Sequence, residues 1–209
     1  MKIAVISSNG KAGKLIVEEA VNRGLDVTGI ARSGNTSKAE KFLQKDIFDL
    51  TTEDLKEFDA VVDAFGAWTP ETLPEHDTTL KHLSDILSGT KIRLVVVGGA
   101  GSLYVNAEHT QQVQDGPDFP DMFKPLASNM GIALDNLRQR NDVNWTYISP
   151  AADFQADGAR TGEYILAGEE FTLNDKNESV ISYADYAIAV VDEIASGNHI
   201  QKRISVLKK

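Results

Sequence analysis

Short apolar runs alternate along the chain with longer segments whose apolar residues recur every three or four positions. The short runs predict strands, which we place at residues 2–7, 25–32, 44–47, 59–65, 91–97, 145–149, 170–173, 180–181 and 203–207. The longer segments predict helices, which we place at residues 11–23, 37–42, 76–88, 125–140 and 183–196, with a further helix capped by Thr51. Strands that alternate with helices favour a parallel sheet with helices on both faces.

Two segments show no clear period. Residues 103–124 contain Gly, Pro and Asp, and we expect a loop of the length that is typical of an active-site flap. Residues 154–168 are predicted to be irregular, within a small C-terminal extension on the substrate side of the sheet. A chain of 209 residues suits one α/β domain, so we expect residues 1–209 to form a single Rossmann-type, doubly wound domain.

The turn after the first strand carries most of a dinucleotide-binding motif. Gly10 and Gly13 occupy its second and third glycine positions, and Ser7 occupies the first. A serine makes this turn if its φ stays negative. The helix that follows offers free N–H groups and a partial positive charge to a pyrophosphate. A Walker A loop is disfavoured because Leu15 follows Gly13 and Lys14, where that motif needs Ser or Thr.

The end of the second strand favours NADP(H) over NAD(H). NAD-binding sites place an acid here to bind the ribose, whereas this chain has Arg32 followed by Ser33. A guanidinium is always charged and binds a 2′-phosphate through two hydrogen bonds, and the serine hydroxyl adds a third donor. The alternative is that Arg32 is an ordinary solvent-exposed residue at the end of a strand.

Five more motifs accompany this turn, namely VTGIAR at residues 27–32, AFG at residues 64–66, GGAGSL at residues 98–103, WTYISP at residues 145–150 and SYADYA at residues 182–187. With SSNGKAG at residues 7–13, they resemble the motifs of atypical short-chain dehydrogenase/reductases, and most of all those of the NmrA-like NAD(P)H-binding subgroup, the NADH-flavin reductase family. The resemblance spans nearly the whole chain, and Ser7 with Ser8 is its main departure. It implies a nicotinamide cofactor bound by Ser7, Asn9, Gly10, Lys11, Ala12, Gly13, Arg32, Ser33, Asp46, Ala64, Phe65, Gly66, Gly98, Gly99 and Pro150.

The Tyr-x-x-x-Lys proton donor of the wider superfamily is absent, because none of the five tyrosines has a lysine four positions later. Hydride transfer to a flavin does not need such a donor, since solvent can protonate the product. We therefore expect an NADPH-dependent reductase of a flavin, quinone or similar flat acceptor. Ser102 and Tyr104 are the candidate catalytic residues, and Trp68, Phe123 and Phe154 are further candidate walls of the acceptor site.

Other interpretations of these residues stay open. Trp68 and Phe154 also suit ordinary packing, Ser102 suits a loop cap, and Tyr104 suits a surface position. The absent donor also fits a non-catalytic NADP(H)-binding regulator that senses the redox ratio and binds a partner protein. A sugar-nucleotide epimerase is disfavoured by the same absence.

Composition argues against two classes of binding partner. A net charge of −10 argues against binding to nucleic acid or to an anionic membrane. There is no cysteine, and the four histidines lack the spacing of metal ligands, so we expect no metal site. The chain has no signal-peptide pattern and no apolar run near the ~20 residues of a membrane span. We therefore expect a cytoplasmic protein, and the sequence does not predict its oligomeric state.

Overall fold

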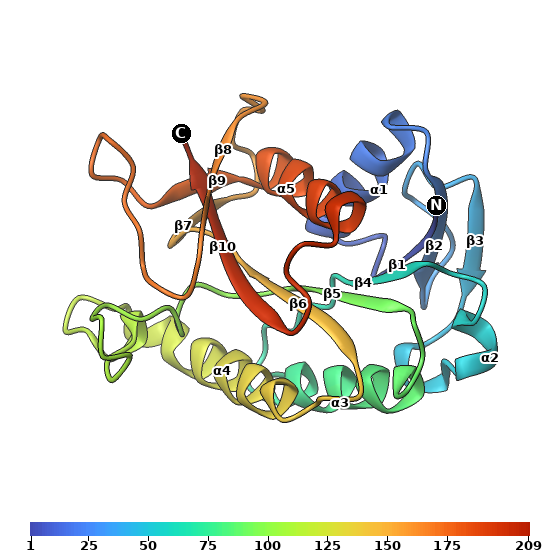
Figure 1. Cartoon of the computed structure of the whole chain (residues 1–209), viewed down its shortest axis with the longest axis horizontal. Helices are drawn as coiled ribbons and strands as arrows, with labels where there is room; N and C mark the ends of the chain where they lie inside the picture. Colours follow the sequence, from blue (N-terminus) through green and yellow to red (C-terminus); the bar gives the residue numbers. More distant parts are fainter.

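An eight-stranded sheet runs through the computed structural model, which describes residues 1–209 (Figure 1). The strands follow the order β3 (Lys41–Gln44), β2 (Asp26–Ala31), β1 (Lys2–Ile6), β4 (Ala60–Asp63), β5 (Arg93–Val97), β6 (Asn144–Ser149), β10 (Lys202–Lys208) and β8 (Tyr164–Ala167). Neighbouring strands are parallel except β8, which is antiparallel to β10. The predicted doubly wound α/β fold is confirmed.

Helices cover both faces of the sheet (Figure 1). One pair, α1 (Lys11–Asn22) and α5 (Tyr183–Ser196), packs on one face, and the other pair, α3 (Glu75–Leu87) and α4 (Lys124–Arg138), packs on the opposite face. In β1, Val5 faces the first pair of helices and Ile6 faces the second. Because both faces are buried, the central strands read as nearly continuous apolar runs.

Local signals in the sequence set several helix boundaries. α1 ends just before Gly24, which has a φ of 74° and stops the helix without strain. The single-turn helix α2 (Thr52–Leu55) begins after Thr51, whose hydroxyl accepts a hydrogen bond from the Asp54 N–H. The first and last residues of α5 are the predicted ones, and Gly197 ends the helix with a φ of 67°.

The structure corrects the predictions around the third strand. Residues 37–42 form no helix, and the third strand is β3, at Lys41–Gln44 rather than at residues 44–47. β3 lies at the edge of the sheet and none of its side chains is fully buried. Its apolar pattern is therefore weak, and pairing with β2 decides where the strand lies.

The C-terminal extension also differs from the predictions. Residues 154–168, expected to be irregular, contain most of β7 (Asp153–Gln155) and all of β8. Residues 170–173 form no strand and contribute only an isolated bridge between Glu170 and Tyr104. β7 pairs with β9 (Val180–Ser182), and β8 pairs with β10. These strands form by pairing with partners that lie far along the chain, and a local pattern does not reveal such partners.

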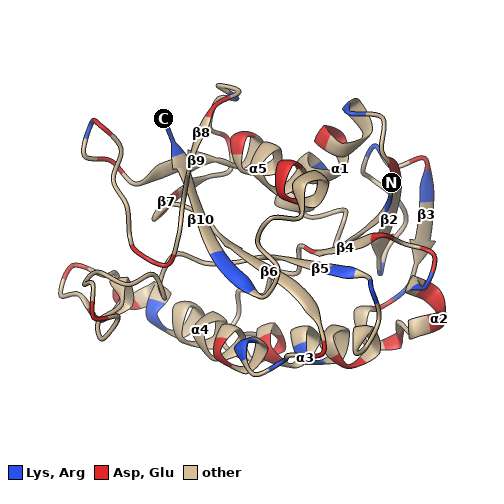
Figure 2. Cartoon of the chain, viewed as in Figure 1, with Lys and Arg blue, Asp and Glu red and all other residues tan.

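Charged residues are spread over the surface elements. Acidic residues outnumber basic ones by 31 to 21, and Figure 2 shows Lys and Arg scattered among them over the helices and loops. None of the helices combines the length and the apolar character needed to cross a bilayer. No three His, Asp or Glu side chains converge in a way that would hold a metal ion.

Candidate functional site

Three predicted cofactor segments meet where the central strands have their carboxyl ends. Residues 7–13 follow β1, residues 64–66 follow β4, and residues 98–99 follow β5. These three strands are adjacent and parallel, so their carboxyl ends lie together. The chain winds outward from β1 in one direction and from β4 in the other, and in such sheets a ligand crevice forms where the two directions part.

Ser7 makes the turn out of β1 with a φ of 58°, which contradicts the expected negative value. A residue with a side chain pays about 1 kcal/mol for this left-handed conformation, which explains why glycine is usual at this position. The Gly10 N–H donates to the Ser7 carbonyl oxygen at 2.9 Å and closes the turn. The serine therefore adopts the glycine conformation, and the shape of the turn is kept.

Gly13 lets α1 pack directly on this turn. A methyl carbon at Gly13 would lie 2.4 Å from the Ser7 carbonyl oxygen, and one at Gly10 would lie 3.2 Å from the same atom. The N-terminus of α1 has no side-chain cap and no acid in its first turn. The N–H groups of Lys11, Ala12 and Gly13 are therefore open to an anion, and this close backbone approach fits a pyrophosphate.

Asn9 joins the glycine turn to the loop after β2. Its side-chain amide nitrogen donates to the carbonyl oxygens of Ser33 and Gly34 at 3.3 and 2.9 Å. Its side-chain oxygen accepts a hydrogen bond from the Thr36 N–H at 2.8 Å. These bonds hold the end of β2, and with it Arg32, beside the N-terminus of α1.

Arg32 extends into solvent at the end of β2, with 79 % of its side chain exposed. Its Nε lies 3.9 Å from the Asp46 Oδ2, and the Asp46 Oδ1 accepts a hydrogen bond from the Phe48 N–H at 3.0 Å. An exposed ion pair of this length contributes little to stability. The guanidinium is therefore free to exchange this carboxylate for a phosphate, and the 2′-phosphate interpretation and the ordinary exposed-residue interpretation both fit its position.

The loop after β4 is fixed by His76 of α3. The His76 Nε2 lies 3.3 Å from the Ala67 nitrogen and 3.2 Å from the Ala67 oxygen, and the imidazole packs edge-on against Phe65 with 5.6 Å between ring centroids. Burial lowers the pKa of His76, so the imidazole is neutral at pH 7. Ala64 and Phe65 are half-buried, and Gly66 is exposed.

The loop after β5 rests on Tyr147 of β6. A methyl carbon at Gly98 would lie 2.2 Å from the Tyr147 ring, and the Gly99 N–H donates to the Tyr147 hydroxyl at 3.3 Å. Burial raises the pKa of Tyr147 to about 12, so this hydroxyl keeps its proton. Met130 of α4 packs against Gly99, and Pro150 is buried just after β6. Glycine is required at residue 98 because the ring occupies the space of any side chain.

Asp63, the last residue of β4, is a buried acid beneath these two loops. One of its carboxylate oxygens accepts a hydrogen bond from the Phe65 N–H at 3.0 Å. Asp63, His76, Met130 and Tyr147 line a small cavity of about 10 Å³ between the sheet and the helix pair α3 and α4. Burial raises the pKa of Asp63 to about 6, because the charged carboxylate has lost its hydration.

Replacing Asp63→Asn should remove a pH dependence of stability. The pKa of Asp63 is about 6 in the folded chain against 3.8 for an ordinary aspartate. The folded chain therefore holds the Asp63 proton more tightly than the unfolded chain does. This preference stabilises the fold fully when the pH is below the ordinary pKa of aspartate, and the stabilisation is lost as the pH rises through the pKa of the folded chain. We expect the wild type to lose about 2 kcal/mol of unfolding free energy relative to Asp63→Asn between about pH 4 and pH 7.5.

Urea unfolding of both proteins across this range measures the difference. Asp118→Asn is the matched control, because Asp118 is exposed on the loop before α4. We expect the stability difference between this control and the wild type to stay constant with pH. A constant difference for Asp63→Asn as well would contradict the prediction.

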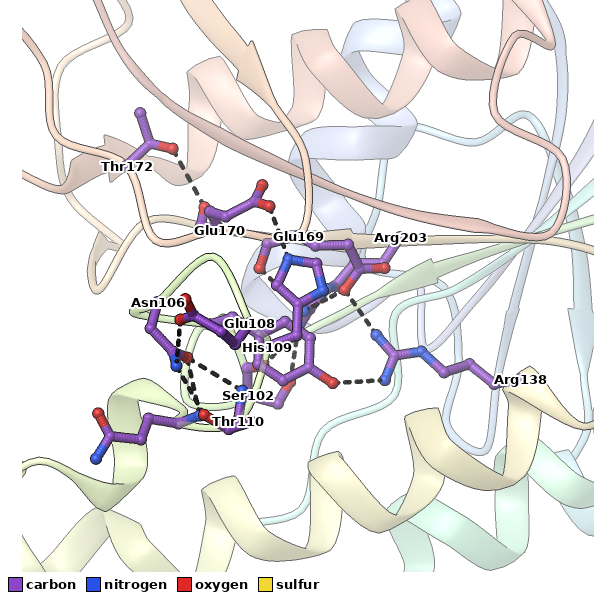
Figure 3. Close-up of polar contacts among 12 residues, drawn as sticks. Ser102, Asn106, Glu108, His109, Thr110, Arg138, Glu169, Glu170, Thr172 and Arg203 are labelled. Atoms are coloured by element: carbon purple, nitrogen blue, oxygen red, sulfur yellow. Dashed lines mark hydrogen bonds and ion pairs between the residues drawn. The ribbon is translucent and has the colours of Figure 1, made fainter.

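A second polar cluster surrounds Arg203 of β10, as Figure 3 shows. The Arg203 side chain is fully buried, and it donates to the Ser102 carbonyl oxygen at 2.8 Å and to the Ser102 hydroxyl at 3.0 Å. It also forms an ion pair with Glu169, whose carboxylate bonds Arg138 at 2.7 Å. Ser102, a candidate catalytic residue, is thus buried within the loop that follows β5.

Tyr104, the other candidate catalytic residue, anchors the base of the long loop at residues 103–123. Its ring stacks on His109 with centroids 4.4 Å apart, and the His109 Nε2 lies 2.7 Å from Glu170 (Figure 3). The Tyr104 N–H donates to Glu169, and its carbonyl oxygen accepts from Phe171, at 3.0 and 2.8 Å. The loop is thereby fastened to the segment between β8 and β9.

The remaining aromatic candidates occupy different environments. Phe154 packs between Tyr183 and Tyr186, with ring centroids 3.9 and 4.8 Å away, so it acts in packing. Phe123 is 44 % exposed at the start of α4, and Trp68 is 69 % exposed on the loop after β4.

Sequence reasoning did not find the roles of Asn9, Asp63, His76 and Arg203. Two of them leave a trace in the sequence, because an aspartate ends the apolar run at residues 60–63 and an arginine begins the run at residues 203–207. A charged residue within a buried strand marks either a paired group or a functional one. The contacts of Asn9 and His76 are set by loops and leave no such trace.

Comparisons with known proteins agree with this geometry. A family model described as NAD(P)H-binding matches residues 8–195. The chain therefore belongs to the NAD(P)H-binding family. The resemblance inferred from the sequence is confirmed at this level, and the family match supports a nicotinamide cofactor for this chain.

Individual relatives match over the whole chain. The uncharacterized protein YwnB of Bacillus subtilis (strain 168) is 46 % identical, covering 100 % of this chain and 99 % of that protein. The crystal structure of SP1627 from Streptococcus pneumoniae TIGR4, named a "putative NADH-flavin reductase", is 57 % identical with a TM-score of 0.98, covering 100 % of both chains. A "putative epimerase" structure from Bacteroides thetaiotaomicron is 31 % identical with a TM-score of 0.86, covering 99 % of this chain and 96 % of that one.

Proposed function

We propose that the protein is an NADPH-dependent reductase that transfers hydride to a flavin, a quinone or a similar flat acceptor. The observation that carries the proposal is the bare N-terminus of α1 beneath the glycine turn, with Arg32 beside it at the end of β2. The similarity to SP1627 supports the same class of reaction, because that protein is named for flavin reduction.

In this proposal each loop has a separate task. The backbone at residues 10–13 binds the pyrophosphate, and Arg32 with Ser33 binds the 2′-phosphate. The loops at residues 64–66 and 98–99 flank the nicotinamide end. When bound, the reduced nicotinamide supplies the hydride, and water supplies the proton that the reduced acceptor takes up.

Ser102 and Tyr104 stay the candidate catalytic residues. The Ser102 hydroxyl accepts a hydrogen bond from Arg203, which leaves its own proton to donate to the nicotinamide carboxamide. The Tyr104 hydroxyl likewise lies 3.5 Å from the Arg138 Nη1 as an acceptor. Both hydroxyls are therefore oriented by arginine side chains.

Consumption of NADPH tests the proposal directly. Purified protein is mixed with NADPH and with FMN, FAD or menadione, and the absorbance of the reduced nicotinamide is followed. We expect its loss to depend on both enzyme and acceptor. Tight binding of NADPH without consumption would overturn the reductase proposal and would favour the NADP(H)-sensing regulator instead.

Replacing Arg32→Ala tests the choice of cofactor. A hydrogen-bonded charge pair is worth about 1.5–3 kcal/mol, so we expect the Kd of NADPH to rise by about tenfold or more while the Kd of NADH stays nearly constant. Titration calorimetry with both cofactors measures the two values. Arg32→Lys is the matched control, since it keeps the charge but not the paired donors. Equal weakening of both cofactors by Arg32→Ala would contradict a 2′-phosphate contact.

A further inference from the structure

Trp68 is an exposed tryptophan at the mouth of the crevice. Its residue surface is 69 % exposed, whereas Trp145, the other tryptophan in the chain, is 3 % exposed. A large aromatic side chain gains much free energy when its apolar area is removed from water, so leaving it exposed forgoes that gain. An exposed indole beside the loop after β4 offers a flat apolar face that a planar ligand can cover.

The backbone on both sides of Trp68 is fixed. On one side Ala67 is buried and its peptide groups contact His76, as described above. On the other side the Thr69 carbonyl oxygen accepts hydrogen bonds from the N–H groups of Thr72 and Leu73 at 2.9 and 3.0 Å. The indole is thus carried on a rigid support, which is what a stacking surface needs to bind a ring without a large loss of entropy.

The indole lies against the loop that we propose as a wall of the cofactor site. A methyl carbon at Gly66 would lie 3.5 Å from the Trp68 Nε1, which is ordinary van der Waals contact. Gly66 follows β4 at the strand end next to the glycine turn. The ring is therefore at the rim of the crevice and not on a remote surface.

The interior behind this rim has no room for an acceptor. The cavity lined by Asp63, His76 and Tyr147 has a volume of about 10 Å³, which is the space of one water molecule at most. Any flat acceptor must therefore lie outside the loops after β4 and β5. Outside these loops, the exposed indole of Trp68 provides a planar surface for such an acceptor.

We propose that Trp68 binds the acceptor by stacking its indole on a planar heteroaromatic ring, such as the isoalloxazine of a flavin, held over the nicotinamide end of the crevice. This inference rests on the proposed reductase function and names its acceptor class. Stacking on an aromatic side chain tolerates many substituents, because it uses the face of the ring and not its edge. His76 is the positioning residue, since it holds the peptide group of Ala67.

Binding of riboflavin in the presence of NADP⁺ tests the inference without turnover. We expect Trp68→Ala to raise the Kd of riboflavin by about tenfold or more and Trp68→Phe to raise it by about threefold or less. The Kd of NADP⁺ should stay unchanged in both variants, which shows that the crevice is intact. Leu166→Ala is the matched control, because Leu166 is 49 % exposed on the outer strand β8 and should leave riboflavin binding unchanged.

The outcomes separate this inference from the proposed function. Riboflavin binding that Trp68→Ala does not weaken would overturn the inference, and so would a wild type that binds no riboflavin. Riboflavin binding that depends on Trp68, without consumption of NADPH, would support the inference and overturn the reductase proposal.

Discussion

Replacing Arg203→Met should lower the free energy of unfolding by about 3–5 kcal/mol, because a fully buried guanidinium and the hydrogen bonds that it donates are lost. Methionine fills part of the space but donates no hydrogen bond. The carbonyl oxygens of Ser102 and Glu169, which accept from Arg203 at 2.8 and 3.1 Å, would be left without this donor. Each buried acceptor left in this way costs about 1–3 kcal/mol. Urea unfolding of both proteins measures the change.

Arg138→Met is the matched control for this experiment. Arg138 bonds the same Glu169 carboxylate at 2.7 Å, but its side chain is 25 % exposed and water can replace it. We expect a loss of about 1 kcal/mol or less for this variant. If Arg203→Met costs no more than Arg138→Met, burial of the guanidinium is not what stabilises the base of the long loop.

Replacing Gly13→Ala should damage stability and cofactor binding together. The added methyl carbon would lie 2.4 Å from the Ser7 carbonyl oxygen, a backbone atom that moves only if the turn or the helix moves. Overpacking of this kind costs about 1–3 kcal/mol. Since the same shift misplaces the N–H groups at the start of α1, we expect the Kd of NADPH to rise by about a hundredfold.

Gly10→Ala is the graded comparison. Its methyl carbon would lie 3.2 Å from the same oxygen, so a small adjustment is enough to accept it. We expect unfolding free energy within about 1 kcal/mol of the wild type but weaker NADPH binding, because the second glycine is where the pyrophosphate approaches the backbone. Calorimetry and urea unfolding of both variants separate the two effects. A Gly13→Ala protein as stable as Gly10→Ala would contradict the packing argument.

The sequence predicted best the elements whose signals are local. α5 has an apolar face, a Ser182 cap and a Gly197 stop, and its bounds are as predicted. The central strands are buried on both faces, so their apolar runs are visible without knowledge of their partners. The glycine turn was also recognisable, although the positive φ of Ser7 was not, because serine gives no sign that it will adopt a glycine conformation.

The rest of the site depends on contacts between distant residues. β8 is an edge strand with one neighbour, and its pairing with β10 joins residues 164–167 to residues 205–208. His76 acts across nine residues and Arg203 across a hundred and one, so neither contact is visible in a local window. The sequence was enough to place Ser102, one of the two candidate catalytic residues, on a loop. It was not enough to predict that Ser102 is buried there against Arg203.

The position of β10 has a consequence for how the chain folds as it is synthesised. β10 follows every other strand in the sequence, yet it lies inside the sheet between β6 and β8. The first five strands can pair with one another as they emerge, whereas β8 has no partner until residues 202–208 arrive. Until then Glu169 also lacks Arg203, and the edge of β6 is open to other chains. The second half of the nascent protein can therefore complete its part of the sheet only after β10 has been synthesised.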